Sequence, residues 1–139
     1  MTPTEVFVDT ACVVALLNDA DEHHETASTL FDLVRSKSRL VTTRAVCFEI
    51  GNAFAKRPDR GSAMGFLQDI EEADDIAVVP IDEDLYVRSL QLFGNRPDKK
   101  WSLTDCSSFL VMQERGIKSA LTTDHHFSQA GFLALLRPA

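Results

Sequence analysis

The stretch Val6-Phe7-Val8-Asp9-Thr10 decides how the rest of the chain is interpreted. Its apolar run is typical of a short strand, and Asp9-Thr10 stops that strand and can cap a helix through Leu17. The same order returns near the C-terminus, where Asp124 directly follows an apolar strand. Both aspartates therefore stand at the carboxyl end of a strand, where α/β sheets commonly place their ligands.

Between these two stretches, β-rich runs alternate with helical periodicity. Strands are predicted for 6–8, 39–42, 76–81, 119–122 and 132–136, and further helices for 23–35, 43–55, 62–72, 82–93, 102–115 and 124–129. This alternation predicts an α/β protein with a mostly parallel sheet. Because no repeat, low-complexity tract or linker interrupts it, we expect residues 1–139 to form a single domain.

The composition excludes several classes of protein. The longest apolar run, 11–17, is too short to cross a bilayer, and the N-terminus lacks the pattern of a secretory signal. Three widely spaced cysteines, Cys12, Cys47 and Cys106, argue against a disulfide framework and against a thiolate zinc site. We expect each to be a small buried apolar residue in a protein of the reducing cytoplasm.

The formal net charge of −7 argues, taken alone, against a nucleic-acid ligand. Phosphate groups are bound mainly by Lys and Arg, and acidic side chains outnumber basic ones here. A cluster of carboxylates that binds divalent cations would remove the conflict, since the bound ions reverse the local charge.

Two further acids stand where apolar residues are expected. Glu49 lies three residues after Val46 and four before Ala53, which places it on the apolar face of its helix. Asp105 shares a helix face with Phe109 in the same way. Buried carboxylates are costly and repel one another, and a hard ion such as Mg²⁺ or Mn²⁺ removes both costs. Such a site suits hydrolysis of a phosphodiester by a metal-activated water.

Each acid also has a purely structural interpretation. Asp9 and Asp124 can each cap the helix that follows, and Asp105 can complete a capping box. Glu49 can pair with Arg44, which precedes it on the same helix. One acid alone is therefore a weak signal, whereas the set of four in this order on this alternation of elements favours a metal site.

The basic loop 94–100 leads into the helix that carries Asp105. We hypothesise that Lys99 and Lys100 contact phosphates and that Trp101 stacks on a base. The alternative is a solvated loop whose lone tryptophan packs on the core. The pairs His23-His24 and His125-His126 also invite a transition-metal interpretation, although a helix start and a capped turn account for them more simply.

Four segments of the chain resemble the PIN-domain family. They are Phe7-Val-Asp9-Thr-Ala, Phe48-Glu49-Ile-Gly-Asn-Ala, Ser102-Leu-Thr-Asp105-Cys-Ser-Ser-Phe, and Ala120-Leu-Thr-Thr-Asp124-His-His-Phe followed by Ala130-Gly-Phe. The resemblance runs from about residue 6 to residue 136, and all four acidic positions of the family are filled. It implies a three-layer α/β/α fold with a short, mostly parallel central sheet.

The resemblance also implies an activity. PIN domains are divalent-metal-dependent endoribonucleases that leave a 5′-phosphate and a 3′-hydroxyl. By this likeness, Mg²⁺ or Mn²⁺ would be held by four catalytic, metal-binding residues: Asp9, Glu49, Asp105 and Asp124. The hydroxyls of Thr10 and Thr104 would support that site. A stand-alone domain of this size is similar to VapC-type toxins, which commonly form homodimers and are silenced by a small antitoxin.

Three other functions are weighed against this one. A catalytically silent PIN-fold binding or scaffold module would be favoured by loss of one acid, and none is lost. A phosphoacceptor receiver domain needs an acidic pair after its first strand, where this chain has only Asp9. A haloacid-dehalogenase-type phosphatase needs Asp-x-Asp there, and Ala11 excludes that pattern.

Overall fold

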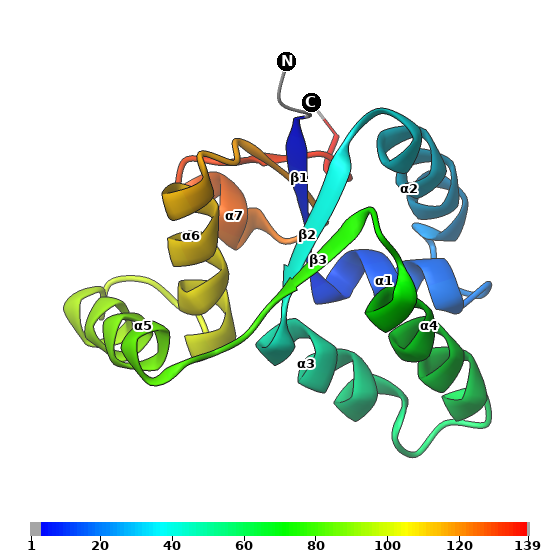
Figure 1. The fold of residues 1–139 in the computed structure, drawn as a ribbon, viewed down its shortest axis with the longest axis horizontal. Coiled ribbons are helices and arrows are strands. Elements are labelled where there is room, and N and C mark those ends of the chain that lie inside the picture. The colour runs from blue at the N-terminus through cyan, green and yellow to red at the C-terminus, as the bar shows by residue number, and fades with distance from the viewer. Residues whose placement is uncertain (1–3, 139) are drawn as a thin grey trace.

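The fold is a parallel five-stranded sheet between two layers of helices (Figure 1). The computed structural model describes residues 4–138. Its strands are β1 (Glu5–Val8), β2 (Arg39–Thr43), β3 (Ile76–Val79), β4 (Ser119–Leu121) and β5 (Leu133–Ala134). They are ordered β3-β2-β1-β4-β5, and every neighbouring pair is parallel. The α/β class and the parallel sheet predicted from the sequence are thus confirmed.

Helices fill the connections between the strands. They are α1 (Thr10–Leu17), α2 (His24–Lys37), α3 (Arg44–Phe54), α4 (Arg60–Glu72), α5 (Glu83–Asn95), α6 (Leu103–Arg115) and α7 (His125–Gln129). In Figure 1, α1, α2 and α4 lie to one side of the sheet, and α5, α6 and α7 lie to the other. Helix α3 begins where β2 ends, at the carboxyl edge of the sheet.

Several element boundaries differ from those predicted. Strand β3 ends at Val79 rather than at residue 81, because Pro80 has no N–H to donate to a neighbouring strand. Strand β5 is shorter than predicted, although the N–H groups of Leu135 and Leu136 still donate to carbonyls of Ala120 and Thr122. Helix α2 runs on to Lys37.

Local sequence signals account for several helix ends. Thr43 caps α3 by accepting from the Val46 N–H, and Asp82 caps α5 in the same way. Helix α6 opens with the predicted capping box of Ser102 and Asp105, and it ends at Gly116, whose φ of 67° is the left-handed conformation that favours glycine.

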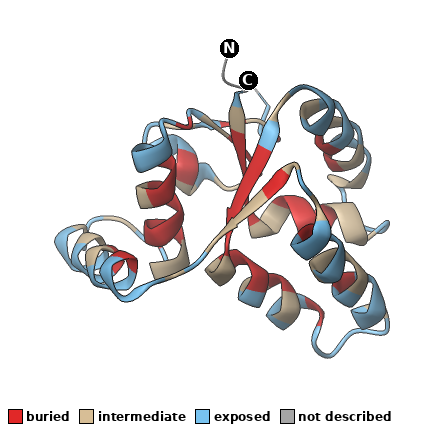
Figure 2. Cartoon of the chain, viewed as in Figure 1, coloured by how far each residue is buried: buried red, intermediate tan, exposed pale blue. Residues whose placement is uncertain are grey.

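The core lies on both faces of the sheet and is closed on one side by aromatic rings. Figure 2 shows the buried residues along the central strands and on the inner faces of the helices. On the α6–α7 side, the Phe127 ring lies 6.2 Å from that of Phe7 on β1 and 5.0 Å from that of Phe109 on α6. These contacts fix α6 and α7 to the sheet and so fix the positions of Asp105 and Asp124.

Two further findings bear on the composition. The three cysteines are buried, as the sequence predicts. Among residues 4–138, no helix has the length and apolar character needed to span a membrane.

Candidate functional site

Asp9 lies at the carboxyl end of β1 with 5% of its surface exposed. Although it occupies the N-cap position of α1, its side chain makes no capping hydrogen bond. Its Oδ2 instead accepts a 2.8 Å hydrogen bond from the Thr122 hydroxyl. Burial raises the pKa of Asp9 to about 7, and the charges of Asp105 and Glu49 add to the rise, against the opposing effect of the Thr122 bond. The capping interpretation of Asp9 is therefore wrong.

Glu49 projects from α3 toward the start of α1. Its Oε1 accepts a 2.6 Å hydrogen bond from the Thr10 hydroxyl, so Thr10 does contact one of the four acids, as expected. Arg44, the proposed partner of Glu49, forms an ion pair with Glu71 instead. The structural interpretation of Glu49 as half of an ion pair with Arg44 is thus also wrong.

Asp105 serves the capping box and faces the other acids at the same time. Its Oδ2 accepts from the Ser102 N–H at 3.0 Å and lies 3.1 Å from Nδ1 of His126. Burial raises the pKa of Asp105, and the charge of Asp124 raises it further, while the contacts with Ser102 and His126 oppose the rise. The capping-box interpretation of Asp105 is therefore confirmed, and its role as a metal ligand stays a prediction.

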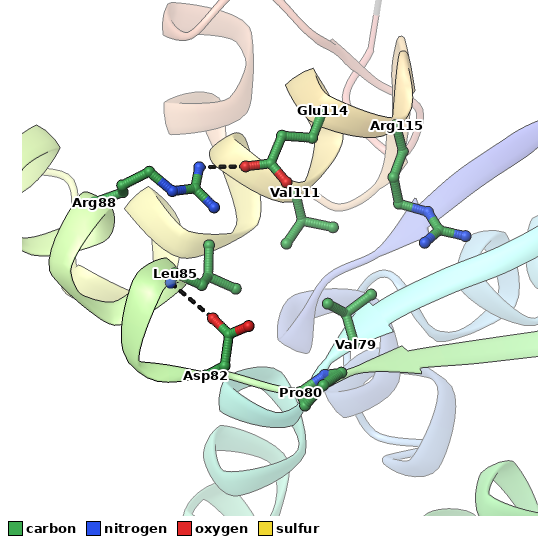
Figure 3. A pocket seen from close by; sticks show the side chains of 8 residues that line it. All are labelled: Val79, Pro80, Asp82, Leu85, Arg88, Val111, Glu114 and Arg115. Atoms are coloured by element: carbon green, nitrogen blue, oxygen red, sulfur yellow. Dashed lines mark hydrogen bonds and ion pairs between the residues drawn. The ribbon is translucent and has the colours of Figure 1, made fainter.

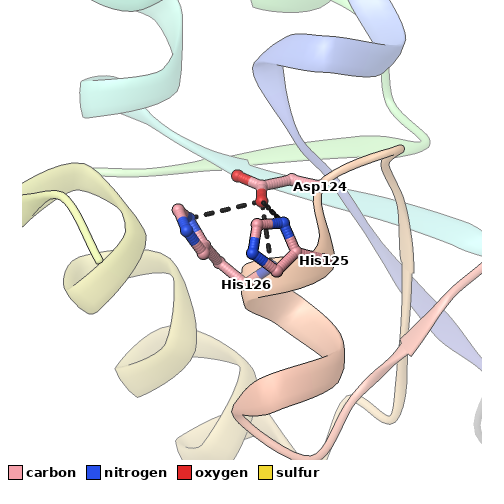
Figure 4. A group of neighbouring side chains, drawn as sticks. All are labelled: Asp124, His125 and His126. Carbon is pink, nitrogen blue, oxygen red and sulfur yellow. Dashed lines mark hydrogen bonds and ion pairs between the residues drawn. The ribbon is translucent and has the colours of Figure 1, made fainter. Parts of the chain in front are cut away.

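Asp124 caps α7 and lies beside the rings of His125 and His126 (Figure 4). Its Oδ1 accepts from the His126 N–H at 2.9 Å, and its own N–H donates to the Thr122 hydroxyl at 3.0 Å. Thr122 therefore links Asp9 and Asp124 through a single hydroxyl group. Capping accounts for only part of the surroundings of Asp124.

The four acids gather at one edge of the sheet without basic partners. Within the described part of the chain, no Lys or Arg forms an ion pair with Asp9, Glu49, Asp105 or Asp124, and only histidines approach the last two. Their negative charge is therefore uncompensated by the protein. Oxygen donors in this number suit Mg²⁺ or Mn²⁺, and a bound divalent ion would offset both the burial cost and the repulsion.

The spacing of these ligands bears on how an ion would be held. Among the described residues, the one group of three or more candidate ligands with all ligand atoms within 4.8 Å of one another is Asp124, His125 and His126. The carboxylate oxygens of the four acids are spread more widely than the ligand atoms of that group. Binding would thus need small side-chain movements, bridging waters or more than one ion.

Comparison with known proteins places this arrangement in a family. The sequence model of the PIN domain matches residues 6–133, and this stretch includes all four acids. The chain belongs to the PIN-domain family.

Within the family, this PIN domain is similar to a characterised VapC-type toxin. It is 30% identical over 129 residues to "23S rRNA-specific endonuclease VapC20" of two Mycobacterium tuberculosis strains, covering 92% of this chain and 95% of the relative. The crystal structure of Mycobacterium tuberculosis VapC20, a "Sarcin-Ricin loop cleaving toxin", superposes with a TM-score of 0.83 at 29% identity, over 92% of this chain and 96% of the other. The resemblance to VapC-type toxins is thereby confirmed.

A more distant structure shares the fold. VapBC2 from Rickettsia felis, bound to a DNA fragment from its promoter, gives a TM-score of 0.68 at 10% identity over 94% of this PIN domain and 96% of the other chain. At that identity the likeness concerns the fold alone.

Trp101 packs as a core residue. It is 6% exposed, its ring meets that of Phe109 edge-on at 5.0 Å, and its Nε1 donates to the Gln129 side chain at 3.0 Å. The Arg96 guanidinium lies over the ring, 5.0 Å from its centroid. With 6% of its surface exposed, Trp101 has little ring surface available to a base, so the structure favours the core contact over base stacking.

The remaining predicted residues lie in different surroundings. Lys100 is exposed and Lys99 is half-buried on the loop before α6, so both stay candidates for contact with phosphates. Thr104 lines a cavity of about 130 Å³ with Tyr86 and Ser89, and its carbonyl accepts from the Ser107 hydroxyl. No hydrogen bond joins the Thr104 hydroxyl to the four acids within residues 4–138.

Thr122 and His126 are the site residues that sequence reasoning did not assign. Thr122 is fully buried directly after β4, beside Asp9, which directly follows the adjacent strand β1. The only signal in the sequence was its place in Thr122-Thr123-Asp124, directly after a strand. His126 was interpreted as part of a capped turn, which is correct for its backbone but does not describe its ring.

A second charged region lies between the end of β3, α5 and α6 (Figure 3). It is a cavity of about 150 Å³ whose lining includes Asp82, Arg88, Glu114 and Arg115. Asp82 accepts from the Leu85 N–H, and Arg88 pairs with Glu114. None of the acids predicted to bind metal lines this cavity, and its charged groups are already partnered.

Proposed function

We propose that this PIN domain is an endoribonuclease that depends on Mg²⁺ or Mn²⁺ and acts as the toxin of a toxin–antitoxin pair. The observation that carries the proposal is the group of four carboxylates without a basic partner, in which buried Asp9 has a pKa of about 7. Such a group at the carboxyl edge of the sheet lowers the stability of the metal-free protein. Binding of a divalent cation offsets this loss.

The chain's own residues would hold and orient that centre. Asp9, Glu49, Asp105 and Asp124 supply the oxygen ligands, and a bound divalent ion lowers the pKa of a water and neutralises charge on the phosphate. The Thr122 hydroxyl orients Asp9, and the Thr10 hydroxyl orients Glu49. No side chain is needed as a nucleophile, since water attacks the phosphorus and the 3′ oxygen leaves, giving a 5′-phosphate and a 3′-hydroxyl.

The same centre explains how an acidic protein can act on RNA. Metal ions bound at the four acids would turn this group of negative charges into a site for phosphate. Lys99 and Lys100, on the loop that leads into α6, would add contacts to the RNA backbone. The ribosomal RNA loop cleaved by VapC20 is the first substrate to test, because that toxin aligns with this chain over nearly its whole length.

The partners follow from the proposed toxin function. We infer a small antitoxin that silences the nuclease, and a homodimer of the toxin. Large apolar side chains that are exposed on this single chain, among them Phe48, Met64, Leu90 and Phe93, provide surface for such partners. Light scattering of the chain alone and with its antitoxin would measure both assemblies.

The test is cleavage of RNA by the purified chain. A panel of single-stranded RNAs and a sarcin–ricin loop hairpin would be incubated with Mg²⁺, Mn²⁺ or EDTA, beside the Asp9→Asn and Asp105→Asn variants. We expect metal-dependent products with 5′-phosphates from the wild type and none from either variant. Cleavage that continues in EDTA, or in both variants, would contradict the proposal. Metal binding without any cleavage would favour the silent binding module instead.

A further inference from the structure

The ring of His126 lies between the carboxylates of two of the four acids, Asp105 and Asp124. It is the second residue of α7, and 19% of its side-chain surface is exposed. Its Nδ1 lies 3.1 Å from Oδ2 of Asp105 and 3.3 Å from Oδ1 of Asp124. Figure 4 shows the ring turned toward Asp124. These two acids come from different helices, so the ring bridges α6 and α7.

We propose that His126 is a positioning residue whose Nδ1–H holds Asp105 and Asp124 at the spacing that the metal ion needs. This inference rests on the proposed metal-dependent function. Two carboxylates facing one site repel each other, and without a donor between them they would turn apart. A single N–H shared between the two oxygens offsets that repulsion before any ion is bound.

The backbone of His126 reinforces the same arrangement. Its N–H donates to Oδ1 of Asp124 at 2.9 Å, the oxygen that Nδ1 also approaches. Asp124 is thus held by the main chain and the ring of one residue, and Asp105 is held by the ring and the Ser102 N–H. Without the ring, each acid would keep only its capping bond, which orients it toward its own helix.

A competing role for the ring is direct coordination. Asp124, His125 and His126 offer ligand atoms within 4.8 Å of one another, a group that could chelate a transition metal. In the tautomer that carries its hydrogen on Nδ1, this nitrogen donates to the carboxylates and has no lone pair for a metal, so direct coordination would have to use Nε2. His125 is also less engaged, since 57% of its side chain is exposed and its Nδ1 lies 3.7 Å from Asp124.

Substitutions at position 126 separate the two roles. The amide nitrogen of asparagine reaches the place of Nδ1, so His126→Asn keeps a donor between the acids but offers metals a poor ligand. His126→Leu removes the donor and keeps an apolar side chain of similar size. His126→Ala is a second variant without a donor, for use if His126→Leu does not fold. His125→Leu is the matched control on the same helix turn.

The experiment is a titration of each purified, folded variant with Mn²⁺, followed by the electron paramagnetic resonance of the free ion. We expect His126→Leu to weaken Mn²⁺ binding about 10- to 100-fold, the range found when a group that orients a metal ligand is removed. His126→Asn should bind within about threefold of the wild type, and His125→Leu within about twofold.

Three results would overturn the inference in different ways. If His126→Asn loses as much affinity as His126→Leu, the ring is a ligand. If His126→Leu binds as the wild type does while Asp105→Asn binds weakly, the ring is dispensable and the proposed metal site stands. If Asp105→Asn also binds as tightly as the wild type, the proposed function fails together with the inference.

Discussion

Two regions of this PIN domain gather charged side chains, and they differ in how the charge is balanced. In the cavity beside α5, Arg88 pairs with Asp84 and Glu114, and Arg115 pairs with Glu5. At the carboxyl edge of the sheet, the partners of the four acids within residues 4–138 are hydroxyls, N–H groups and histidine rings. The first region is balanced by the protein itself, and the second is not.

This difference separates a structural role from a functional one. An exposed ion pair contributes little to stability, and its charges are neutralised without a bound ligand. A buried carboxylate without a cation, such as Asp9, destabilises the apo protein until a cation binds. The candidate metal centre is therefore distinguished by negative charge that no basic side chain neutralises. Neither the number of charges nor the volume of a cavity distinguishes it.

Neutralising acids in each region by substitution gives the largest expected difference, which is a difference in the rate of RNA cleavage. Asp9→Asn and Asp105→Asn should each lower RNA cleavage by roughly 10³-fold, because a metal ligand contributes several kcal/mol of transition-state stabilisation. Glu114→Gln, which removes a charge from the paired region, should change the rate by less than about twofold. Single-turnover cleavage rates in Mg²⁺ measure both. Equal losses in the two regions would remove the distinction between them.

The pH dependence of stability is the next largest effect. The folded-state pKa of Asp9 is raised from 3.8 to about 7, so the folded protein keeps a proton that the unfolded chain releases. The contribution of Asp9 is thus fully present below pH 3.8 and is lost as the pH rises through about 7. Relative to Asp9→Asn, the apo wild type should lose about 2 to 4 kcal/mol between pH 4 and pH 8.

Urea unfolding in EDTA at a series of pH values measures this difference. Asp9→Asn serves as the control, because it cannot ionise at position 9 and retains every other titrating group. If the free energies of unfolding of the two proteins changed in parallel with pH, the pKa of Asp9 would not be raised in the folded protein.

Stabilisation by a bound metal ion should depend on the acids at the carboxyl edge of the sheet. Mg²⁺ at a hundredfold excess over its Kd should stabilise the wild type by about 2.7 kcal/mol. Asp105→Asn should melt at a higher temperature than the wild type in EDTA, because repulsion is relieved, and should gain less from Mg²⁺. Thermal melts with and without the ion measure this. An equal gain in both proteins would argue against Asp105 as a ligand.

The smallest expected effect concerns the route by which RNA approaches the centre. Replacing Lys99 and Lys100 with alanine should weaken RNA binding several-fold and reduce the slope of log K against log salt by about 0.7 for each phosphate that is no longer neutralised. Lys118→Ala is the control, since that residue precedes β4 at the opposite edge of the sheet. Binding assays with a catalytically inactive variant measure it. Unchanged salt dependence in the double variant would exclude the loop.

What the sequence could predict depended on whether the signal is local. Asp9 and Asp105 stand at fixed places beside a strand end and a helix start, so their approach to one edge of the sheet follows from the parallel α/β pattern. Thr122 and Asp9 meet only because β4 pairs with β1, across 113 residues of chain. No local pattern reports such a neighbour.

Side-chain direction was the second limit. The position of Trp101 beside two lysines suited a substrate contact as well as a core contact, and only its packing on Phe109 decides for the core. The Asp124 cap was predicted, yet the same turn aims the His126 ring at Asp105, which the capping pattern does not specify. Thr104 was expected at the metal site and instead lines the cavity beside α5.

The most direct test of the central claim is to locate the metal. Crystals of the wild type soaked in Mn²⁺ would be measured near the manganese absorption edge, and an anomalous difference map would be calculated. We expect a peak within bonding distance of carboxylate oxygens from Asp9 and Asp105, absent in Asp9→Asn crystals treated in the same way. A peak only beside Glu114 or other paired acids, with none at the carboxyl edge of the sheet, would contradict the proposed metal centre.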